Sequence, residues 1–402
     1  MSSFNTAVNL GSLIPWSEVQ AALGTTFKDY PKSKAVVLVG GTAAMLWASP
    51  VGAAVARTCE LVVSLRPSKH SGKIQTYNGM YDDESSEARK EAYSTLVDSY
   101  YDLATAFYEW GWGYCFHFAF RRKTESWRDA YNRHETLLAS KLNVAKGATL
   151  LDCGCGVGGP ARVIAQFLGC QVKGVTINGY QVKRGNTLSG RMGLNQQVQL
   201  IQADFMKLPF QDAEFDGVYA IESTCHAPNR EGVYSEIMRV LKPGGVFATY
   251  EWGLTSAYDP SSEEHRLLKH RIEVGDGLPD LIQTTEITGA LIAAGFEVLE
   301  ARDYAEDSNV AAGDEPWYGP LLPSWNPLSW PCFQFNALMQ AVLPWLLRFG
   351  EIVRILPADV SKTREMLLEA GLGCRAGGLT NTFTPMWLMV AKKPLTPATT
   401  KK

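Results

Sequence analysis

The residues best suited to chemistry form a glycine-rich loop directly after a short apolar run. Residues 149–159 have the sequence TLLDCGCGVGG, so Asp152 stands just before the first of four glycines. Pro160 then opens a helical pattern, at a position where the missing N–H costs no intrahelical hydrogen bond. Glycines allow a tight turn against a ligand, and the helix directs unpaired N–H groups at it. The stretch predicts a strand, a ligand-binding turn and a helix N-terminus.

Two kinds of ligand are compatible with this glycine spacing. Gly154, Gly156 and Gly159 satisfy the dinucleotide pattern G-x-G-x-x-G, which is weak by itself. A dinucleotide site expects an acid about 20 residues further on, and residues 175–181 contain none. S-adenosylmethionine has no pyrophosphate but carries an ammonium, which the carboxylate of Asp152 can pair. We predict an S-adenosylmethionine site; a glycine turn that serves packing alone is the alternative.

A parallel sheet must position these residues, because strands and helices alternate from residue 150 on. The predicted strands after the first cover residues 171–176, 198–203, 216–221, 246–251, 296–301 and 385–392. The predicted helices between them cover residues 180–192, 229–241 and 284–294. The last two strands are separated by an insertion with helical stretches at residues 333–355 and 361–372.

Ligands of such sheets lie at the carboxyl ends of the strands. This rule places residues 152–158, 176–181, 204–205 and 222–226 around one crevice. There, Asn178 and Gln181 can bind ribose hydroxyls, and Asp204 can accept from an adenine amino group. Each polar residue alone could instead be a turn or helix cap. The predicted cofactor-binding residues are Asp152, Gly154, Gly156, Gly158, Thr176, Asn178, Gln181, Asp204, Phe205 and Glu222.

A second unusual stretch precedes the glycine loop. Residues 108–118 (YEWGWGYCFHF) hold six aromatic residues and a histidine, interrupted by two glycines. Amphipathic helices are predicted on either side, over residues 84–108 and 127–142. An aromatic segment of this kind can line a pocket, pack in a core or form a membrane-interface belt.

Composition limits the remaining classes of function. The 402 residues carry a net charge of −3 without a long basic run, so we expect no nucleic-acid partner. The eight cysteines are scattered, and the one close pair, Cys153 and Cys155, lies inside the glycine loop without nearby histidines. We therefore expect no metal site and reduced thiols facing the cytosol.

Residues 35–56 contain no charge and are bracketed by Lys32, Lys34 and Arg57. That length can span a bilayer. We favour a membrane anchor there, with a buried helical hairpin as the alternative.

From about residue 84 to residue 394 the chain resembles the sterol C24-methyltransferases, a branch of the class I S-adenosylmethionine-dependent methyltransferases. The aromatic stretch 108–118 is similar to the family's sterol signature, and residues 151–160 to its cofactor loop. Further matches lie at residues 203–206, 224–228, 250–252, 275–279 and 383–386. Tyr114, Cys115, Ser223 and residues 311–343 depart from the pattern on the presumed substrate side. Triterpene methyltransferases share the same overall pattern of motifs and are therefore the nearest alternative.

The resemblance implies an α/β fold: a Rossmann-like seven-stranded sheet whose last strand is antiparallel. It also implies four regions. They are an N-terminal region with the membrane segment (1–75), a helical substrate cap (76–147), the cofactor-binding domain (148–304) and a C-terminal α+β sterol-methyltransferase region (305–402). A homo-oligomer at the endoplasmic reticulum membrane is expected as well, with the catalytic domain in the cytosol. The lipid-droplet surface is the alternative membrane partner.

The implied reaction transfers a methyl group to the C24 alkene of a cycloartenol- or zymosterol-like Δ24 sterol. An alkene is a weak nucleophile, so it must be held dry and close, and the resulting carbocation needs stabilisation by aromatic rings. Candidate substrate-binding rings are those of Tyr108, Trp110, Trp112, Phe116 and Phe118. Candidate bases are Glu222 and His226, which follow the fourth strand, and Glu109 and His117. The resemblance links His117 and Tyr108 to sterol binding and catalysis. Tyr108 and Trp112 join the four candidate bases in the predicted catalytic set. A lipid-binding protein that keeps the fold but not the chemistry is the non-enzymatic alternative.

Overall fold

The computed structural model describes residues 77, 80, 81, 86–111, 113–323, 337–354, 356 and 359–395. Side chains are described for these except residues 103, 110, 111 and 337–339. The predicted anchor at residues 35–56 and Trp112 lie outside this part of the chain. Among the described helices, none combines the length and apolar character needed to cross a bilayer.

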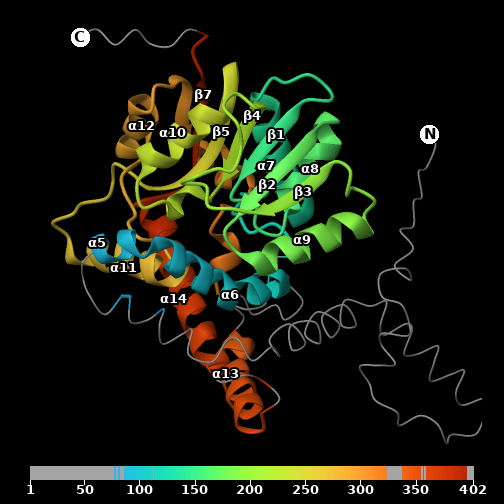
Figure 1. Cartoon of the computed structure of the whole chain (residues 1–402). Coiled ribbons are helices and arrows are strands. Elements are labelled where there is room, and N and C mark those ends of the chain that lie inside the picture. The colour runs from blue at the N-terminus through green and yellow to red at the C-terminus, as the bar shows by residue number, and fades with distance from the viewer. Residues whose placement is uncertain are drawn as a thin grey trace, which may run out of the picture. The chain divides into compact units, whose positions relative to one another are not determined.

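Seven strands form one sheet in the order β3-β2-β1-β4-β5-β7-β6 (Figure 1). The first five pair in parallel, whereas β7 runs antiparallel to both β5 and β6. The predicted class I sheet with an antiparallel last strand is confirmed. The strands are β1 Thr149–Cys153, β2 Gln171–Thr176, β3 Val198–Gln202, β4 Phe215–Ile221, β5 Leu241–Leu254, β6 Glu297–Asp303 and β7 Phe383–Lys392.

Helices cover both faces of the sheet, which is why its central strands are apolar on both sides. The helices α7 (Trp127–Lys141), α8 (Gly159–Leu168) and α9 (Gly179–Arg191) pack on one face around a core that includes Leu138 and Ile164. On the other face, α10 (Arg230–Val240) and α12 (Thr284–Ala293) pack around a core that includes Tyr234 and Leu291.

The remaining helices form a layer at the edge of the sheet where the parallel strands end (Figure 1). These helices are α5 Ser86–Glu91, α6 Tyr93–Gly111, α11 Glu263–Asp276, α13 Ala337–Ile352 and α14 Val360–Thr380. The helix predicted over residues 84–108 is thus divided in two at Ala92. Helix α11 was not predicted, although Ser262 caps its first turn and Gly277, in the left-handed region, ends it.

Helix α14 extends eight residues beyond its predicted end at residue 372. Glycines lower the helix propensity of this stretch, but Gly377 serves close packing. A Cβ on Gly377 would lie 2.7 Å from the Cβ of Phe383. Close packing to its neighbours therefore overrides the low helix propensity of glycine.

Candidate active site

The glycine loop has the geometry that its sequence predicts. Gly154 has a φ of +93°, and its N–H donates to the carbonyl of Val175 at 3.0 Å. A Cβ at Gly154 would lie 2.3 Å from the Cβ of Ser223 on the loop after β4. Only glycine fits this position, so the loop presents bare backbone at the end of β1.

Asp152 lies one residue before the end of β1, and its carboxylate lines the cavity beside the loop. Tyr219, its neighbour on β4, donates a hydrogen bond to it at 3.1 Å. Burial raises the pKa of Asp152 to about 7. A cation beside this carboxylate would reverse that shift, so the position fits the ammonium of S-adenosylmethionine.

The glycine-loop cavity, about 800 Å³ in empty volume, is lined by residues at the carboxyl ends of β1, β2, β3 and β4. Most of the predicted cofactor residues line it: Asp152, Gly154, Gly156, Thr176, Gln181, Asp204, Phe205 and Glu222. The crevice expected at the carboxyl ends of the strands is therefore present.

Two predicted cofactor residues do not line this cavity. The Asn178 side chain caps α9 by accepting from the N–H of Gln181 at 3.0 Å, and its amide donates to Asp102 on α6 at 2.6 Å. Gly158 is the N-cap of α8, and a Cβ at this position would press against the side chain of Leu200. Both residues shape the site from outside its lining.

The polar residues that line the cavity are largely hydrogen-bonded within the protein. The hydroxyl of Thr176 donates to Gln181 at 2.6 Å, and the Gln181 amide donates to Thr105 of α6 at 3.2 Å. Asp204 accepts from the backbone N–H of Met206 at 2.8 Å and from the hydroxyl of Tyr93.

Helix α6 closes the glycine-loop cavity, a role that the sequence did not suggest. Tyr93, Val97 and Tyr101 all line it. Their i, i+4 spacing on the helix is the available signal, but such a stripe is equally typical of core packing.

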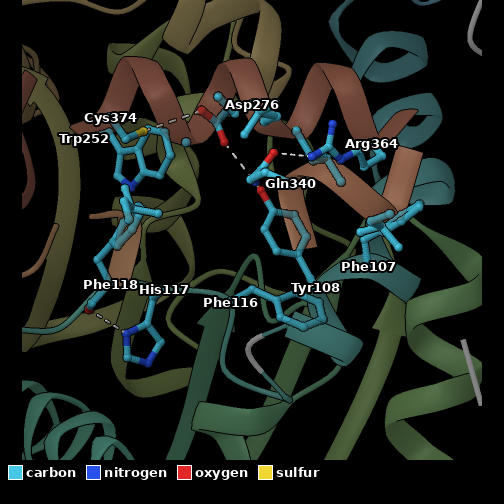
Figure 2. A pocket seen from close by; sticks show the side chains of 16 residues that line it. Phe107, Tyr108, Phe116, His117, Phe118, Trp252, Asp276, Gln340, Arg364 and Cys374 are labelled. Atoms are coloured by element: carbon cyan, nitrogen blue, oxygen red, sulfur yellow. Dashed lines mark hydrogen bonds between the residues drawn. The ribbon is translucent and has the colours of Figure 1, made fainter. Parts of the chain in front are cut away.

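A second cavity lies next to the first and is lined mainly by aromatic and aliphatic side chains (Figure 2). This aromatic cavity has an empty volume of about 870 Å³. Three of the predicted rings, Tyr108, Phe116 and Phe118, line it. The side chain of Trp110 and the whole of Trp112 lie outside the described part of the chain. Phe116 and His117 line both cavities, so the two meet there.

Glu222 lies at this boundary, directly after β4, with a φ of +52° that is rare for a residue with a side chain. One carboxylate oxygen accepts from the N–H of Phe118 at 2.8 Å and the other from the indole of Trp252 at 2.7 Å. Burial raises the pKa of Glu222 to about 8. The carboxylate lines the glycine-loop cavity while its two donors belong to residues of the aromatic cavity.

The two candidate histidines differ in environment. His117 is buried with one ring nitrogen 3.0 Å from Glu135 and the other 2.9 Å from the carbonyl of Phe118. Burial alone would lower the pKa of His117, but the hydrogen bond and charge of Glu135 outweigh it and raise the pKa. His226 lies 2.9 Å from the Tyr101 hydroxyl and 3.2 Å from the Gly277 carbonyl, and burial lowers its pKa to about 4.

Glu109 and Tyr108 are neighbours in sequence but point to different surroundings. Glu109 pairs with Arg184 of α9 at 2.7 Å and lines neither cavity. The Tyr108 ring stacks on Phe116 with 5.3 Å between centroids, and its hydroxyl donates to Asp276 at 3.4 Å.

Four polar residues of the aromatic cavity were not predicted from the sequence: Asp276, Gln340, Arg364 and Cys374. Asp276 ends α11, and burial raises its pKa to about 7. Gln340, Arg364 and Cys374 come from α13 and α14. Asp276 lies within a stretch that matches the family, which was a usable signal, whereas no pattern in the sequence marks Gln340 or Arg364.

Two buried groups in the described part of the chain bring possible metal ligands within 4.8 Å of one another. They share His117 and comprise Cys115, Glu135, His134 and Glu222. The ligand atoms of His117 and Glu222 are already hydrogen-bonded within the protein, as described above. A hydrogen bond accounts for the proximity of His117 and Glu135, and we assign no ion to either group.

Comparison with known proteins identifies two regions and many full-length relatives. Residues 151–249 match a methyltransferase domain, and residues 330–395 match the sterol methyltransferase C-terminal family. The chain is 46% identical to a cycloartenol-C-24-methyltransferase of Arabidopsis thaliana over 77% of this chain and 90% of that protein. It is 41% identical to the sterol 24-C-methyltransferase of Saccharomyces cerevisiae over 80% and 84% of the two chains.

Solved structures share the fold at lower identity. The [4+2]-cyclase SpnF aligns with a TM-score of 0.55 and 24% identity, covering 75% of this chain and 96% of that one. The cyclopropane synthase MmaA2 of Mycobacterium tuberculosis aligns with a TM-score of 0.52 and 15% identity, covering 76% and 96%. The resemblance that the motifs predicted is confirmed by the far higher identity to the curated relatives: the chain belongs to the sterol 24-C-methyltransferase family.

Proposed function

We propose that this protein transfers a methyl group from S-adenosylmethionine to the C24 alkene of a Δ24 sterol. The observation that carries the proposal is the junction of two cavities at Phe116 and His117. One cavity holds an acid and a glycine turn, and the other is lined by rings. The names of the relatives, a cycloartenol-C-24-methyltransferase among them, support a sterol as the acceptor.

The glycine-loop cavity would hold S-adenosylmethionine, which supplies an electrophilic sulfonium methyl group. Asp152 would pair its ammonium, and Gly154 and Gly156 would let it lie against the backbone. Phe205 provides an apolar surface for a flat base. The Gln181 side chain already forms hydrogen bonds with Thr105 and Thr176. To bind the ribose as predicted, it would have to share one of these hydrogen bonds with a ribose hydroxyl.

The aromatic cavity would orient the alkene and exclude water from it. Tyr108, Phe116, Phe118 and Trp252 bring four ring systems to its wall. Methyl transfer leaves a positive charge on the acceptor, and a desolvated ring can stabilise such a charge by about 2 kcal/mol.

Among the four candidate bases, we propose Glu222 as the group that removes the proton. It alone combines a place at the junction with a carboxylate, whereas Glu109 is paired with Arg184 outside both cavities. The low pKa of His226 makes that imidazole a weak base. A cationic donor and substrate would lower the raised pKa of Glu222 and favour its ionised form.

Incubation of the purified protein with methyl-labelled S-adenosylmethionine and a Δ24 sterol tests the proposal. We expect label in the sterol and none in squalene. Label in squalene alone would assign a triterpene methyltransferase. Sterol binding without measurable cofactor binding would assign a lipid-binding protein that has lost the chemistry.

We also propose that the protein works at a membrane surface, since its acceptor would be a membrane lipid. Helix α13 supports this, because large apolar side chains recur along one exposed face: Val342, Trp345, Leu346, Phe349 and Ile352. Interfacial helices have such a face, with tryptophan and phenylalanine among its residues. The endoplasmic reticulum as location, the membrane anchor and a homo-oligomeric state remain predictions from sequence and family.

Flotation with phosphatidylcholine vesicles tests the membrane proposal in the full-length protein. Phe349→Glu should reduce the floated fraction. Phe167→Glu is the matched control, because Phe167 is similarly exposed on α8, away from α13. Equal flotation of the two variants would argue against α13 as a membrane contact.

A further inference from the structure

Tyr114 lies at the point where the glycine-loop cavity opens to solvent. It lines that cavity and is 42% exposed, whereas the other lining residues in the described part of the chain are buried or partly buried. A side chain that faces both the cavity and solvent marks the mouth of the cavity. The departure of Tyr114 from the family pattern was expected on the substrate side, but Tyr114 does not line the aromatic cavity.

The main chain around Tyr114 is packed tightly against the glycine loop. A Cβ on Gly159, the first residue of α8, would lie 2.0 Å from the carbonyl oxygen of Tyr114. The ring of Phe116 lies 3.5 Å from the position of a Cβ on Gly156. Gly113, directly before Tyr114, has a φ of +88°, in the region that favours glycine. The segment from Gly113 to Phe116 therefore runs directly over the loop, and its backbone has little room to move there.

Two arginines contact the Tyr114 ring from the helices that begin beside the cavity. The guanidinium carbon of Arg162 on α8 lies 5.8 Å from the ring centroid, and that of Arg184 on α9 lies 6.0 Å from it. Arg162 also donates to the carbonyl of Val157 at 2.8 Å. Arg184 pairs with Glu109 at 2.7 Å. Both cations are thus held in place, and the ring bridges α8 and α9.

These contacts are strong enough to favour one position of the ring but too weak to lock it. A cation over an aromatic face at an exposed site favours the contact about twofold to fivefold. Two such contacts keep the ring across the mouth for most of the time and still let it swing aside when a ligand enters or leaves.

We propose that Tyr114 is a further cofactor-binding residue, whose ring closes the mouth of the glycine-loop cavity over bound S-adenosylmethionine. This inference rests on the proposed function for the position of the cofactor. A ring that packs on the ligand removes apolar surface of both from water, and this contact must break before the ligand leaves. Loss of such a contact acts mainly on the dissociation rate.

Two other tyrosines of this cavity are less suited to close its mouth. Tyr93 and Tyr101 both come from α6 and are only partly exposed. The hydroxyl of Tyr93 donates to Asp204, and that of Tyr101 lies 2.9 Å from a ring nitrogen of His226. These hydrogen bonds tie both rings to the loops at the strand ends, so they form the wall of the cavity.

The test measures the dissociation rate of S-adenosylhomocysteine from the full-length protein by surface plasmon resonance. Tyr114→Ser should raise this rate about fivefold to thirtyfold, as for the loss of one aromatic contact. Tyr114→Phe keeps the ring and should stay within about threefold of the wild type. Phe167→Ser is the matched control, because it removes an exposed ring of α8 that does not line the cavity. Its rate should match that of the wild type.

A second measurement separates the cofactor side from the substrate side. The ratio of kcat/KM for cycloartenol to that for zymosterol should change less than about twofold in Tyr114→Ser, because Tyr114 does not line the aromatic cavity. A changed ratio with an unchanged dissociation rate would overturn the inference and return Tyr114 to the substrate side.

Two further outcomes would also contradict closure by the ring. They are equal acceleration of dissociation by Phe167→Ser, and a Tyr114→Phe variant that releases the ligand as fast as Tyr114→Ser. If neither sterol is methylated by the wild type, the proposed function fails, while the dissociation rates of S-adenosylhomocysteine still decide the role of Tyr114.

Discussion

The two cavities of this protein are built in different ways. The glycine-loop cavity is formed mainly by loops that directly follow strands of the parallel sheet, and α6 and residues 114–117 cover it. The aromatic cavity draws on α6, residues 116–118, the ends of β5 and α11, and both α13 and α14. A local pattern positions the first cavity, whereas long-range packing of helices positions the second. The first should therefore be sensitive to single loop residues, and the second to the shape of the layer that encloses it.

The largest effect is expected at the acid of the glycine loop. Asp152→Ala removes the buried charge that would pair the cofactor's ammonium, and we expect at least about a hundredfold loss of cofactor affinity. Calorimetry with S-adenosylhomocysteine measures this. Circular dichroism should show a folded protein, and sterol binding should persist, because Asp152 does not line the aromatic cavity. An unchanged cofactor affinity would refute its role.

The pH dependence of cofactor binding sharpens the same point. The raised pKa of Asp152 is about 7. The ionised carboxylate, which pairs with the ammonium of the cofactor, is therefore the minor form below pH 7. Affinity should rise with pH through about 7 and then level off. The Asp152→Ala variant should show no such rise.

The next effect concerns the junction of the cavities. Glu222→Gln keeps the shape but removes the proposed base, and kcat should fall about a hundredfold to ten-thousandfold. The wild-type kcat/KM should decline as pH falls below about 8, because the ionised form of Glu222 is the active one and burial raises its pKa. Initial rates between pH 6 and 10 check this. If Glu222→Gln kept a normal kcat, His117 or His226 would be the base instead of Glu222.

The sequence predicted the two cavities unequally, for the same structural reason. The strands, the glycine turn and the strand-end residues follow from local patterns in the sequence, and parallel strands bring their carboxyl ends to one edge. Helix α11 was missed, and with it the placement of Asp276 opposite Tyr108, because that contact joins residues 168 positions apart. Arg364 and Gln340 carry no local pattern, so only the packing of α13 and α14 shows that they line a cavity.

Removing one ring from each cavity compares them directly. Phe118→Leu keeps an apolar side chain but loses the face that would stabilise positive charge, so kcat should fall about five- to thirtyfold with unchanged cofactor affinity. Phe205→Leu, in the glycine-loop cavity, should weaken cofactor binding severalfold and leave the kcat at saturation near normal. Single-turnover rates and calorimetry separate the two. Identical effects of both variants would mean that the rings only pack.

The smallest effect tests a residue at which sequence and structure differ. Asn178 was predicted to bind the ribose, but it caps α9 and ties that helix to α6 through Asp98 and Asp102. Asn178→Ala should cost about 1 kcal/mol from the lost cap and lower the melting temperature by about 2–4 °C, with less than about threefold change in cofactor affinity. Asn178→Ser keeps a capping oxygen but not the amide, so its melting temperature should lie between those of the alanine variant and the wild type. A tenfold or greater loss of affinity in both variants would instead favour direct contact with the ribose. Cofactor binding would then draw Asn178 into the cavity, and the tie between α6 and α9 would have to open when the ligand binds.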